Sequence, residues 1–412
     1  MATNTSAKST LMSFFLLVCV LVMIICSYLE TGLEPMPITI QYPKVRPFLP
    51  KRAMIATTSK ANQSLVPTRP FPTTSITLNN GSDVPHQYAC QPLQRVVYIK
   101  THKTGSTTLA SIFERYAYLR NLDVAVPPIK RNHVLSDFGL FQTSMTIKIE
   151  KRNRTDFDMI VNHVRYNRGQ MDIAVPRAKY ISIIRHPVAQ FESFFGYFEF
   201  PRRLHINTSN PFETFMSDVK GFYAKKVFQW PRIRNGQLYD FGFDHKYDEN
   251  LTKIKEKIEE LAREIDLVMI NEYYDESLVL LRKMMCWDYE DILYISNGVR
   301  SQSHRYPITE ETEQRILSWN AGDIMLYDHF NETFWKKVHD YGDSFGLDLA
   351  HFRALQRDVK DECIKEDATN KHDKREDKFV VKQNATTFCN DLLRADVPYT
   401  RLLKKAIVGR YR

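Results

Sequence analysis

Glycine is scarce in this sequence. Only 14 of its 412 residues are glycine, and none falls into the pattern Gly, four residues, Gly-Lys, Ser/Thr that cradles the phosphates of ATP in a P-loop. Carboxylates placed to hold magnesium beside such a loop are not apparent either. These absences argue against a nucleotide-dependent kinase.

Signatures of metal and nucleic-acid binding are also missing. The chain has six cysteines, and no pair of them has the spacing of zinc ligands. It contains no basic zipper and no RNA-binding aromatic motif. The formal net charge of +9 favours anionic partners such as phosphates, sulfated sugars or acidic membranes, although a generally basic surface explains it equally. We therefore expect no bound metal and no nucleic-acid partner.

Near its start the chain has one long uncharged segment, Leu11 to Leu29. Its length is about that of a membrane-spanning helix. Lys8 precedes it and Glu30 follows it, so the positive-inside rule places residues 1–10 in the cytosol. A cleaved signal peptide is the alternative, but its apolar core is usually shorter, roughly 7 to 15 residues. The segment predicts an uncleaved signal anchor over residues 11–29, as in a single-pass type II membrane protein.

Seven glycosylation sequons follow this segment and agree with a luminal location for the rest of the chain. They begin at Asn62, Asn80, Asn153, Asn207, Asn250, Asn331 and Asn384.

Four cysteines lie beyond the apolar segment and permit two disulfides in an oxidising compartment, with three possible pairings. We expect Cys363 to pair with Cys389, because a closed loop would restrain an irregular, highly charged tail. Cys286 lies in the apolar segment "RKMMCW", and a buried free thiol is the alternative for it.

The composition changes along the chain. Residues 30–88 hold nine of the 19 prolines and read as an extended stem. Residues 89–412 alternate apolar strands with helical patterns. The expected strands are "RVVYIK", "FDMIVNHV", "KYISIIRHP" and "LVMINEYY"; the expected helices include "TTLASIFERYAYL", "ENLTKIKEKIEELAREID" and "ESLVLLRKMMCW". Strands separated by helices predict an α/β fold with a parallel sheet.

Residues 98–116, "YIKTHKTGSTTLASIFERY", resemble an anion-binding junction between a strand and a helix. A turn at this place aims backbone N–H groups and the positive helix end at an anion. Gly105 lets the backbone approach closely, and nearby hydroxyls can add donors. The candidate binding residues are Lys103, Thr104, Gly105, Ser106, Thr107 and Thr108. An ordinary capped helix start is the alternative.

A second candidate anion-binding site lies in "IIRHPVAQFESFF". Arg185 ends an apolar strand and Ser193 follows on the expected next helix. A strand ending in arginine is unusual unless the guanidinium grips an anion. Two anion-binding sites suit a nucleotide that carries phosphates at both its 5′ and 3′ positions. ATP carries no 3′-phosphate.

These motifs resemble those of the sulfotransferases: the first loop is similar to their 5′-phosphosulfate loop, and Arg185 with Ser193 to their 3′-phosphate motif. More narrowly, "KTHKTGSTT", "VNHVRYN", "IIRHPVAQFESFFGYF" and "LLRKMMCWDYEDILY" resemble the galactose 3-O-sulfotransferases of the Golgi, over roughly Gln94 to Trp335. The stem and the charged tail carry no such resemblance.

The resemblance implies a P-loop-like three-layer sulfotransferase fold with a central parallel sheet. It implies 3′-phosphoadenosine 5′-phosphosulfate as the donor, without a metal. The implied acceptor is the 3-hydroxyl of galactose in a glycolipid or glycoprotein glycan. It also implies a Golgi membrane protein whose catalytic domain, residues 89–412, is luminal.

Two residues are the candidates for the chemistry. Lys103 would stabilise the leaving phosphate. His163 follows a buried strand and would take the proton from the acceptor hydroxyl; related uronyl 2-O-sulfotransferases place a catalytic histidine in a similar "HV" setting. A structural histidine is the alternative for His163, and His102 is the rival base.

Two other functions stay open. One is sulfation of uronic acid or hexosamine in glycosaminoglycans, and the other is a non-catalytic glycan-binding homologue. The sequence also leaves the oligomeric state open, with a homodimer as one outcome.

Overall fold

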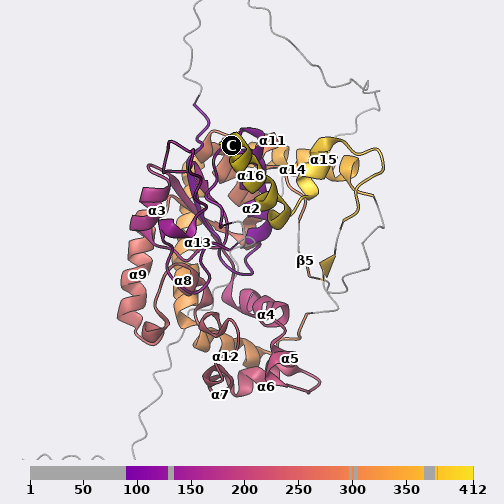
Figure 1. The fold of residues 1–412 in the computed structure, drawn as a ribbon. Coiled ribbons are helices and arrows are strands. Elements are labelled where there is room, and N and C mark those ends of the chain that lie inside the picture. Colours follow the sequence, from indigo (N-terminus) through magenta and orange to yellow (C-terminus); the bar gives the residue numbers. More distant parts are fainter. Residues whose placement is uncertain are drawn as a thin grey trace, which may run out of the picture. The chain divides into compact units, whose positions relative to one another are not determined.

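A parallel sheet of four strands organises the fold in this computed structural model (Figure 1). Its strands are β1 (Val96–Ile99), β2 (Met159–Ile160), β3 (Lys179–Ile184) and β4 (Leu267–Ile270), in the spatial order β2-β1-β3-β4. Nearly all of their residues are buried, as expected for parallel strands covered on both faces. All four strands fall within the segments that the sequence predicted.

The structure describes residues 90–128, 134–296, 299–300, 305–365, 376–377 and 379–411. The predicted cytosolic tail, signal anchor and stem lie outside these residues. Within them, no helix combines the length and the apolar character needed to cross a membrane.

Helices cover both faces of the sheet. The connection from β1 to β2 runs through α2 (Ser106–Leu119), whereas α3 (Arg168–Ala174) and α9 (Leu251–Glu264) connect strands in the opposite direction across the sheet. Because such crossovers are right-handed, α2 lies on one face and α3 and α9 on the other, as Figure 1 shows. This confirms the predicted three-layer α/β fold.

Further helices complete the outer layers. The helix α16 (Asp396–Arg410) packs on α2, and α13 (Ala321–Tyr341) packs on α9 and β4. The others are α4 (Pro187–Tyr197), α5 (Phe200–Leu204), α6 (Pro211–Ser217), α7 (Val219–Ala224), α8 (Gly236–Asp240), α10 (Tyr274–Met285), α11 (Tyr289–Ile292), α12 (Glu310–Trp319), α14 (Ser344–Cys363) and α15 (Thr387–Leu393). A short antiparallel pair joins β5 (Val299–Arg300) to β6 (Glu376–Asp377).

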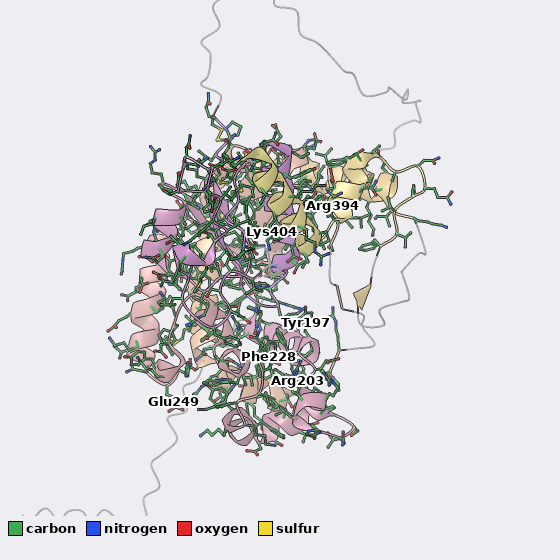
Figure 2. The ribbon with its side chains drawn as sticks, viewed as in Figure 1. Tyr197, Arg203, Phe228, Glu249, Arg394 and Lys404 are labelled. Carbon is green, nitrogen blue, oxygen red and sulfur yellow. A yellow bond between two sulfur atoms is a disulfide. The ribbon has the colours of Figure 1, made fainter. Side chains whose placement is uncertain are left out.

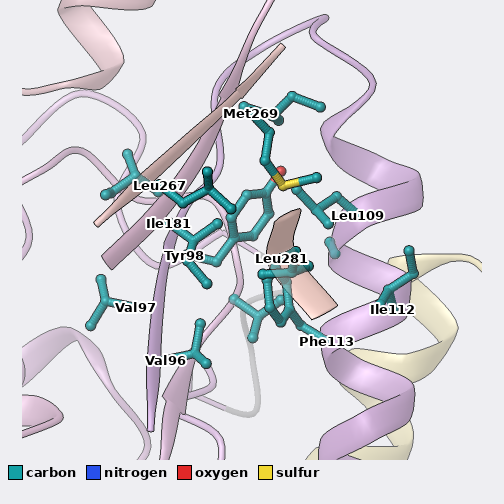
Figure 3. Packing of buried hydrophobic residues seen from close by; sticks show 14 of the residues in the cluster. Val96, Val97, Tyr98, Leu109, Ile112, Phe113, Ile181, Leu267, Met269 and Leu281 are labelled. Carbon is teal, nitrogen blue, oxygen red and sulfur yellow. The ribbon is translucent and has the colours of Figure 1, made fainter. Parts of the chain in front are cut away.

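The main core lies between the sheet and its helices. Figure 3 shows side chains of β1 facing α2, where the ring centroids of Tyr98 and Phe113 are 5.2 Å apart. A second apolar cluster lies under α4 and is rich in phenylalanine. It includes Phe191, Phe194, Phe195, Phe200, Phe212 and Phe215. This cluster anchors α4, the helix that carries Ser193.

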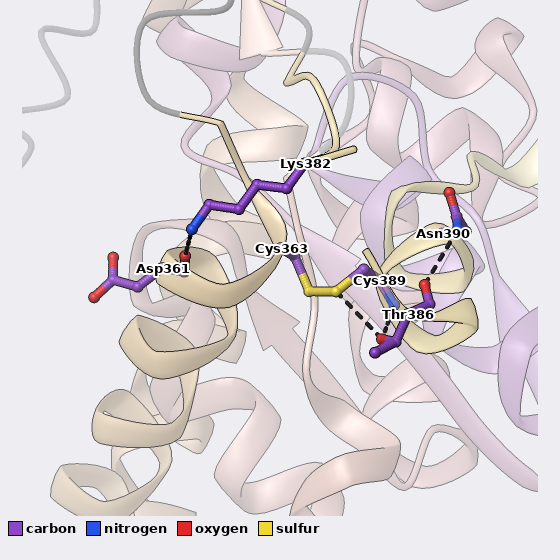
Figure 4. The surroundings of a disulfide bond; sticks show 6 residues. All are labelled: Asp361, Cys363, Lys382, Thr386, Cys389 and Asn390. Carbon is purple, nitrogen blue, oxygen red and sulfur yellow. Dashed lines mark hydrogen bonds between the residues drawn. A yellow bond between two sulfur atoms is a disulfide. The ribbon is translucent and has the colours of Figure 1, made fainter. Parts of the chain in front are cut away.

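Two disulfides are present in the described residues. Cys363 pairs with Cys389 as predicted (Figure 4), and Thr386, which caps α15, lies beside the bond. Cys90 pairs with Cys286, so Cys286 is not the buried free thiol considered from the sequence. Its left-handed backbone at the end of α10, with φ of 55°, turns the chain there.

Candidate active site

The two predicted anion-binding loops meet at the carboxyl ends of adjacent strands. The chain leaves β1 toward β2 and leaves β3 toward β4, so β1 and β3 mark the point where the connections diverge. Ligands of open α/β sheets bind at such a point. Lys103 follows β1 and Arg185 directly follows β3, and the Nη1 of Arg185 donates a hydrogen bond to the Lys103 carbonyl (3.4 Å).

The loop after β1 has an unusual backbone. Lys103 and Gly105 both have positive φ, 63° and 78°. The side chain of Asn271, just after β4, donates to the Thr104 carbonyl (3.0 Å), and a Cβ on Gly105 would lie 2.3 Å from the Asn271 amide nitrogen. Glycine is therefore required at position 105 for the loop to keep this shape.

The first turn of α2 offers its N–H groups to a ligand. Among the described residues no side chain caps this helix. The Ser106 hydroxyl donates to the Thr101 carbonyl (2.6 Å), and the Thr104 hydroxyl lies 2.7 Å from that of Thr101. Because these hydroxyls are engaged within the loop, we expect Ser106 and Thr104 to serve an anion through the backbone. An uncapped helix start of this kind is suited to phosphate.

The backbone of Arg185 is held by one amide side chain. Gln237 accepts a hydrogen bond from the Arg185 N–H (2.9 Å) and donates one to its carbonyl (2.9 Å). Asp323 in turn accepts from the Gln237 N–H (3.0 Å). Ser193 lies further along α4, on the same strand-to-helix connection, and is 9% exposed.

His163 and His102 lie against one another. Their rings stack with centroids 4.3 Å apart. The Nδ1 of His163 is 3.3 Å from the carbonyl oxygen of Lys100. A carbonyl only accepts, so this contact fixes the proton on Nδ1 and leaves Nε2 of His163 able to accept a proton. The structure thus gives the predicted base a suitable tautomer.

A buried ion pair supports His102. Its Nδ1 and its backbone N–H both contact the Asp240 carboxylate at 2.8 Å, and Arg232 binds the other carboxylate oxygen at 2.8 Å. Burial lowers the pKa of His102 and the Arg232 charge lowers it further, against the opposing effect of Asp240. Burial alone favours a neutral Asp240, but the Arg232 charge and the hydrogen bonds from His102 and Arg232 keep its pKa below the ordinary value. His102 is therefore a neutral imidazole beside a permanent carboxylate.

Lys103 is directed across an aromatic ring. Its Nζ lies 3.7 Å from the centroid of Tyr197, the last residue of α4. A cation over a ring face is attracted by the quadrupole of the ring. This contact restrains the ammonium group at the last turn of α4.

Two residues of α16, Asp396 and Thr400, belong to a buried polar network next to the site. Lys100 pairs with Asp396, and Thr400 donates to Glu114 (2.7 Å) and accepts from Asn162 (2.7 Å). Burial raises the pKa of Glu114 well above its ordinary value, which favours the neutral carboxyl. Because His163 contacts the Lys100 carbonyl, this network supports the position of the candidate base.

The supporting residues that were not predicted from the sequence include Arg232, Gln237, Asp240 and Asn271. Asn271 carried a usable signal, since a polar residue that directly follows a buried strand lies at the ligand-binding edge of the sheet. The other three lie between Trp230 and Asp240, where short irregular helices give no periodic pattern.

Comparisons with known proteins point to one family. The sequence model of the family described as galactose-3-O-sulfotransferase matches residues 32–394. This match extends well beyond the segment whose resemblance was visible in the sequence, and it includes most of the stem and of the charged tail.

Individual proteins of known name are similar over most of the chain. Galactosylceramide sulfotransferase of Mus musculus is 32% identical over 325 residues, covering 78% of this chain and 74% of the relative. The Homo sapiens protein of the same name is 32% identical over 67% of this chain and 65% of its own length. Galactose-3-O-sulfotransferase 2 of Mus musculus is 30% identical over 69% of this chain and 73% of its own length.

Proposed function

This chain belongs to the galactose-3-O-sulfotransferase family, and we propose that it transfers a sulfuryl group from 3′-phosphoadenosine 5′-phosphosulfate to the 3-hydroxyl of galactose in a glycolipid or glycoprotein glycan. The observation that carries this proposal is the meeting of the Lys103 and Arg185 loops at one edge of the sheet, beside His163.

The residues of the two loops fit this donor. The uncapped start of α2 and the backbone at Gly105 suit the 5′-phosphosulfate. Arg185, fixed through Gln237, suits the 3′-phosphate together with Ser193. The donor supplies an already activated sulfuryl group, so the protein has only to bind, align and neutralise charge.

The acceptor hydroxyl must lose a proton as its oxygen bonds to sulfur. We assign this proton to Nε2 of His163, whose Nδ1–H faces the Lys100 carbonyl. Lys103 balances the negative charge that develops on the bridging oxygen and then on the 5′-phosphate of the departing adenosine 3′,5′-bisphosphate. The His102 ring stacks on that of His163. Because His102 is neutral, it does not repel the imidazolium that forms on His163.

The relatives favour galactose over uronic acid or hexosamine as the acceptor, because their names specify galactose or galactosylceramide. A non-catalytic glycan-binding protein needs neither a restrained lysine nor a histidine of fixed tautomer, and both are present here.

A transfer assay tests the function. The protein is given donor carrying labelled sulfate, with a panel of soluble galactosides, galactosylceramide, and glycosaminoglycan chains. We expect label on the galactose acceptors and little on the glycosaminoglycans. Label mainly on uronic acid or hexosamine would replace the proposed acceptor, and donor binding without any transfer would favour the non-catalytic alternative.

We also propose that the protein is a single-pass Golgi membrane protein with residues 89–412 in the lumen. The uncharged segment Leu11–Leu29 and the seven sequons support this. Asn207 and Asn384 are exposed, whereas the side-chain oxygen of Asn331 is buried within α13. Glycosidase should lower the apparent mass, and peptide mapping should find glycans at Asn207 and Asn384 but not at Asn331. Digestion of residues 89–412 by protease added to sealed microsomes would contradict this topology.

A further inference from the structure

Next to the candidate active site lies a group of four aromatic rings that we call the aromatic platform: the exposed Phe138, Tyr197 and Phe228, and the partly buried Phe198. Tyr197, Phe228 and Phe138 are 53%, 49% and 46% exposed. The Phe228 centroid lies 6.0 Å from that of Phe198 and 6.3 Å from that of Phe138, and Tyr197 lies 5.0 Å from Phe198. Figure 2 shows Tyr197 and Phe228 near one another at the surface. Contiguous exposed apolar rings mark binding surfaces.

The platform is continuous with the catalytic groups. The Tyr197 ring lies under the Lys103 ammonium group at 3.7 Å. The Phe198 ring lies 6.3 Å from His102, which stacks on His163. A molecule on these rings would therefore border the place where an acceptor oxygen must lie.

The rings are held by the fold. The Phe138 carbonyl accepts hydrogen bonds from Arg165 (2.7 Å) and from the Tyr239 hydroxyl (3.0 Å). Arg203 donates to the Phe198 carbonyl (2.8 Å) and places its guanidinium 5.3 Å from the Phe228 centroid. The platform is thus a preorganised surface with a cationic rim.

We propose that the aromatic platform is the acceptor subsite and that the galactose ring packs its apolar face on it. The axial 4-hydroxyl of β-galactose leaves the C–H groups of C3, C4 and C5 together on one face. An aromatic surface suits that face, and polar groups at the rim suit the surrounding hydroxyls. This inference rests on the proposed function. A sugar is favoured over a lipid chain because the Arg203 guanidinium offers donors to hydroxyls and nothing to a hydrocarbon.

The test uses Phe228, whose ring contacts are with Phe138, Phe198 and Arg203 rather than with Lys103 or the two histidines. With a soluble galactoside as acceptor, Phe228→Ala should raise the acceptor KM about tenfold, with kcat and donor affinity close to wild type. Phe228→Tyr keeps the ring and should restore KM, whereas Phe228→Leu should restore little. The matched control is Leu347→Ala, since Leu347 is an apolar residue 76% exposed on α14, and it should change neither constant.

The outcomes separate this inference from the proposed function. If wild type sulfates galactosides and Phe228→Ala leaves KM unchanged, the platform is not the acceptor subsite. If Phe228→Ala raises KM for galactosylceramide but not for the soluble galactoside, the rings hold the lipid and the inference is wrong. If the wild-type protein sulfates no galactoside, the proposed function is wrong. Galactose is then also wrong as the occupant of the aromatic platform.

Discussion

Replacement of His163 by alanine is expected to lower kcat by roughly 10²- to 10⁴-fold, the usual contribution of a general base. Donor affinity should stay near wild type, because the residues assigned to the donor phosphates are Lys103 to Thr108, Arg185 and Ser193, whereas His163 is assigned to the acceptor hydroxyl. Calorimetry with adenosine 3′,5′-bisphosphate and steady-state kinetics with a galactoside would measure both quantities.

Two variants make this test specific. His339→Ala removes a histidine side chain that is 90% exposed on α13 and should change nothing. His102→Ala should slow turnover and weaken donor binding together, because it removes the stacking partner of His163 and the anchor of its loop on Asp240. If His163→Ala kept near-normal turnover while His102→Ala abolished it with donor affinity unchanged, the base would be His102, whose bond to Asp240 also leaves its Nε2 able to accept a proton.

Replacement of Arg185 by alanine is expected to weaken adenosine 3′,5′-bisphosphate binding by roughly 10- to 150-fold. Loss of a charge-assisted hydrogen bond to phosphate is worth about 1.5–3 kcal/mol, which converts to that range. The effect should be specific to the 3′-phosphate. Adenosine 5′-phosphate should therefore bind wild type and Arg185→Ala about equally.

Controls for Arg185 distinguish ligand binding from loop structure, since its guanidinium also donates to the Lys103 carbonyl. Arg185→Lys keeps the charge and should retain part of the affinity. Arg263→Ala, on the exposed side of α9, should have no effect. If Arg185→Ala weakened the binding of both nucleotides by the same factor, Arg185 would support the loop rather than bind the 3′-phosphate.

The sequence predicted the parts of the fold that repeat with a simple period. The four strands are short buried apolar runs, and α9 places Ile254, Ile258 and Leu261 along its buried face. The loops after β1 and β3 were visible because a lysine, a glycine and an arginine stand where apolar strands end.

The sequence could not predict which distant side chains hold these loops. Asp240 reaches His102 across 138 positions, and Asp396 reaches Lys100 across 296. Such contacts depend on tertiary packing and leave no local pattern. The aromatic platform could not be predicted for the same reason, because Phe138 and Phe228 are far apart in the sequence and come into contact only in the folded chain.

The most direct test of sulfuryl transfer to the galactose 3-hydroxyl compares two acceptors that differ in one oxygen. One is a soluble β-galactoside, and the other is the same compound with hydrogen in place of the 3-hydroxyl. With labelled 3′-phosphoadenosine 5′-phosphosulfate, we expect sulfate on the first compound alone, with NMR placing the ester on O3 of galactose. Equal labelling of the 3-deoxy compound, or an ester on O6 of the first, would contradict this expectation.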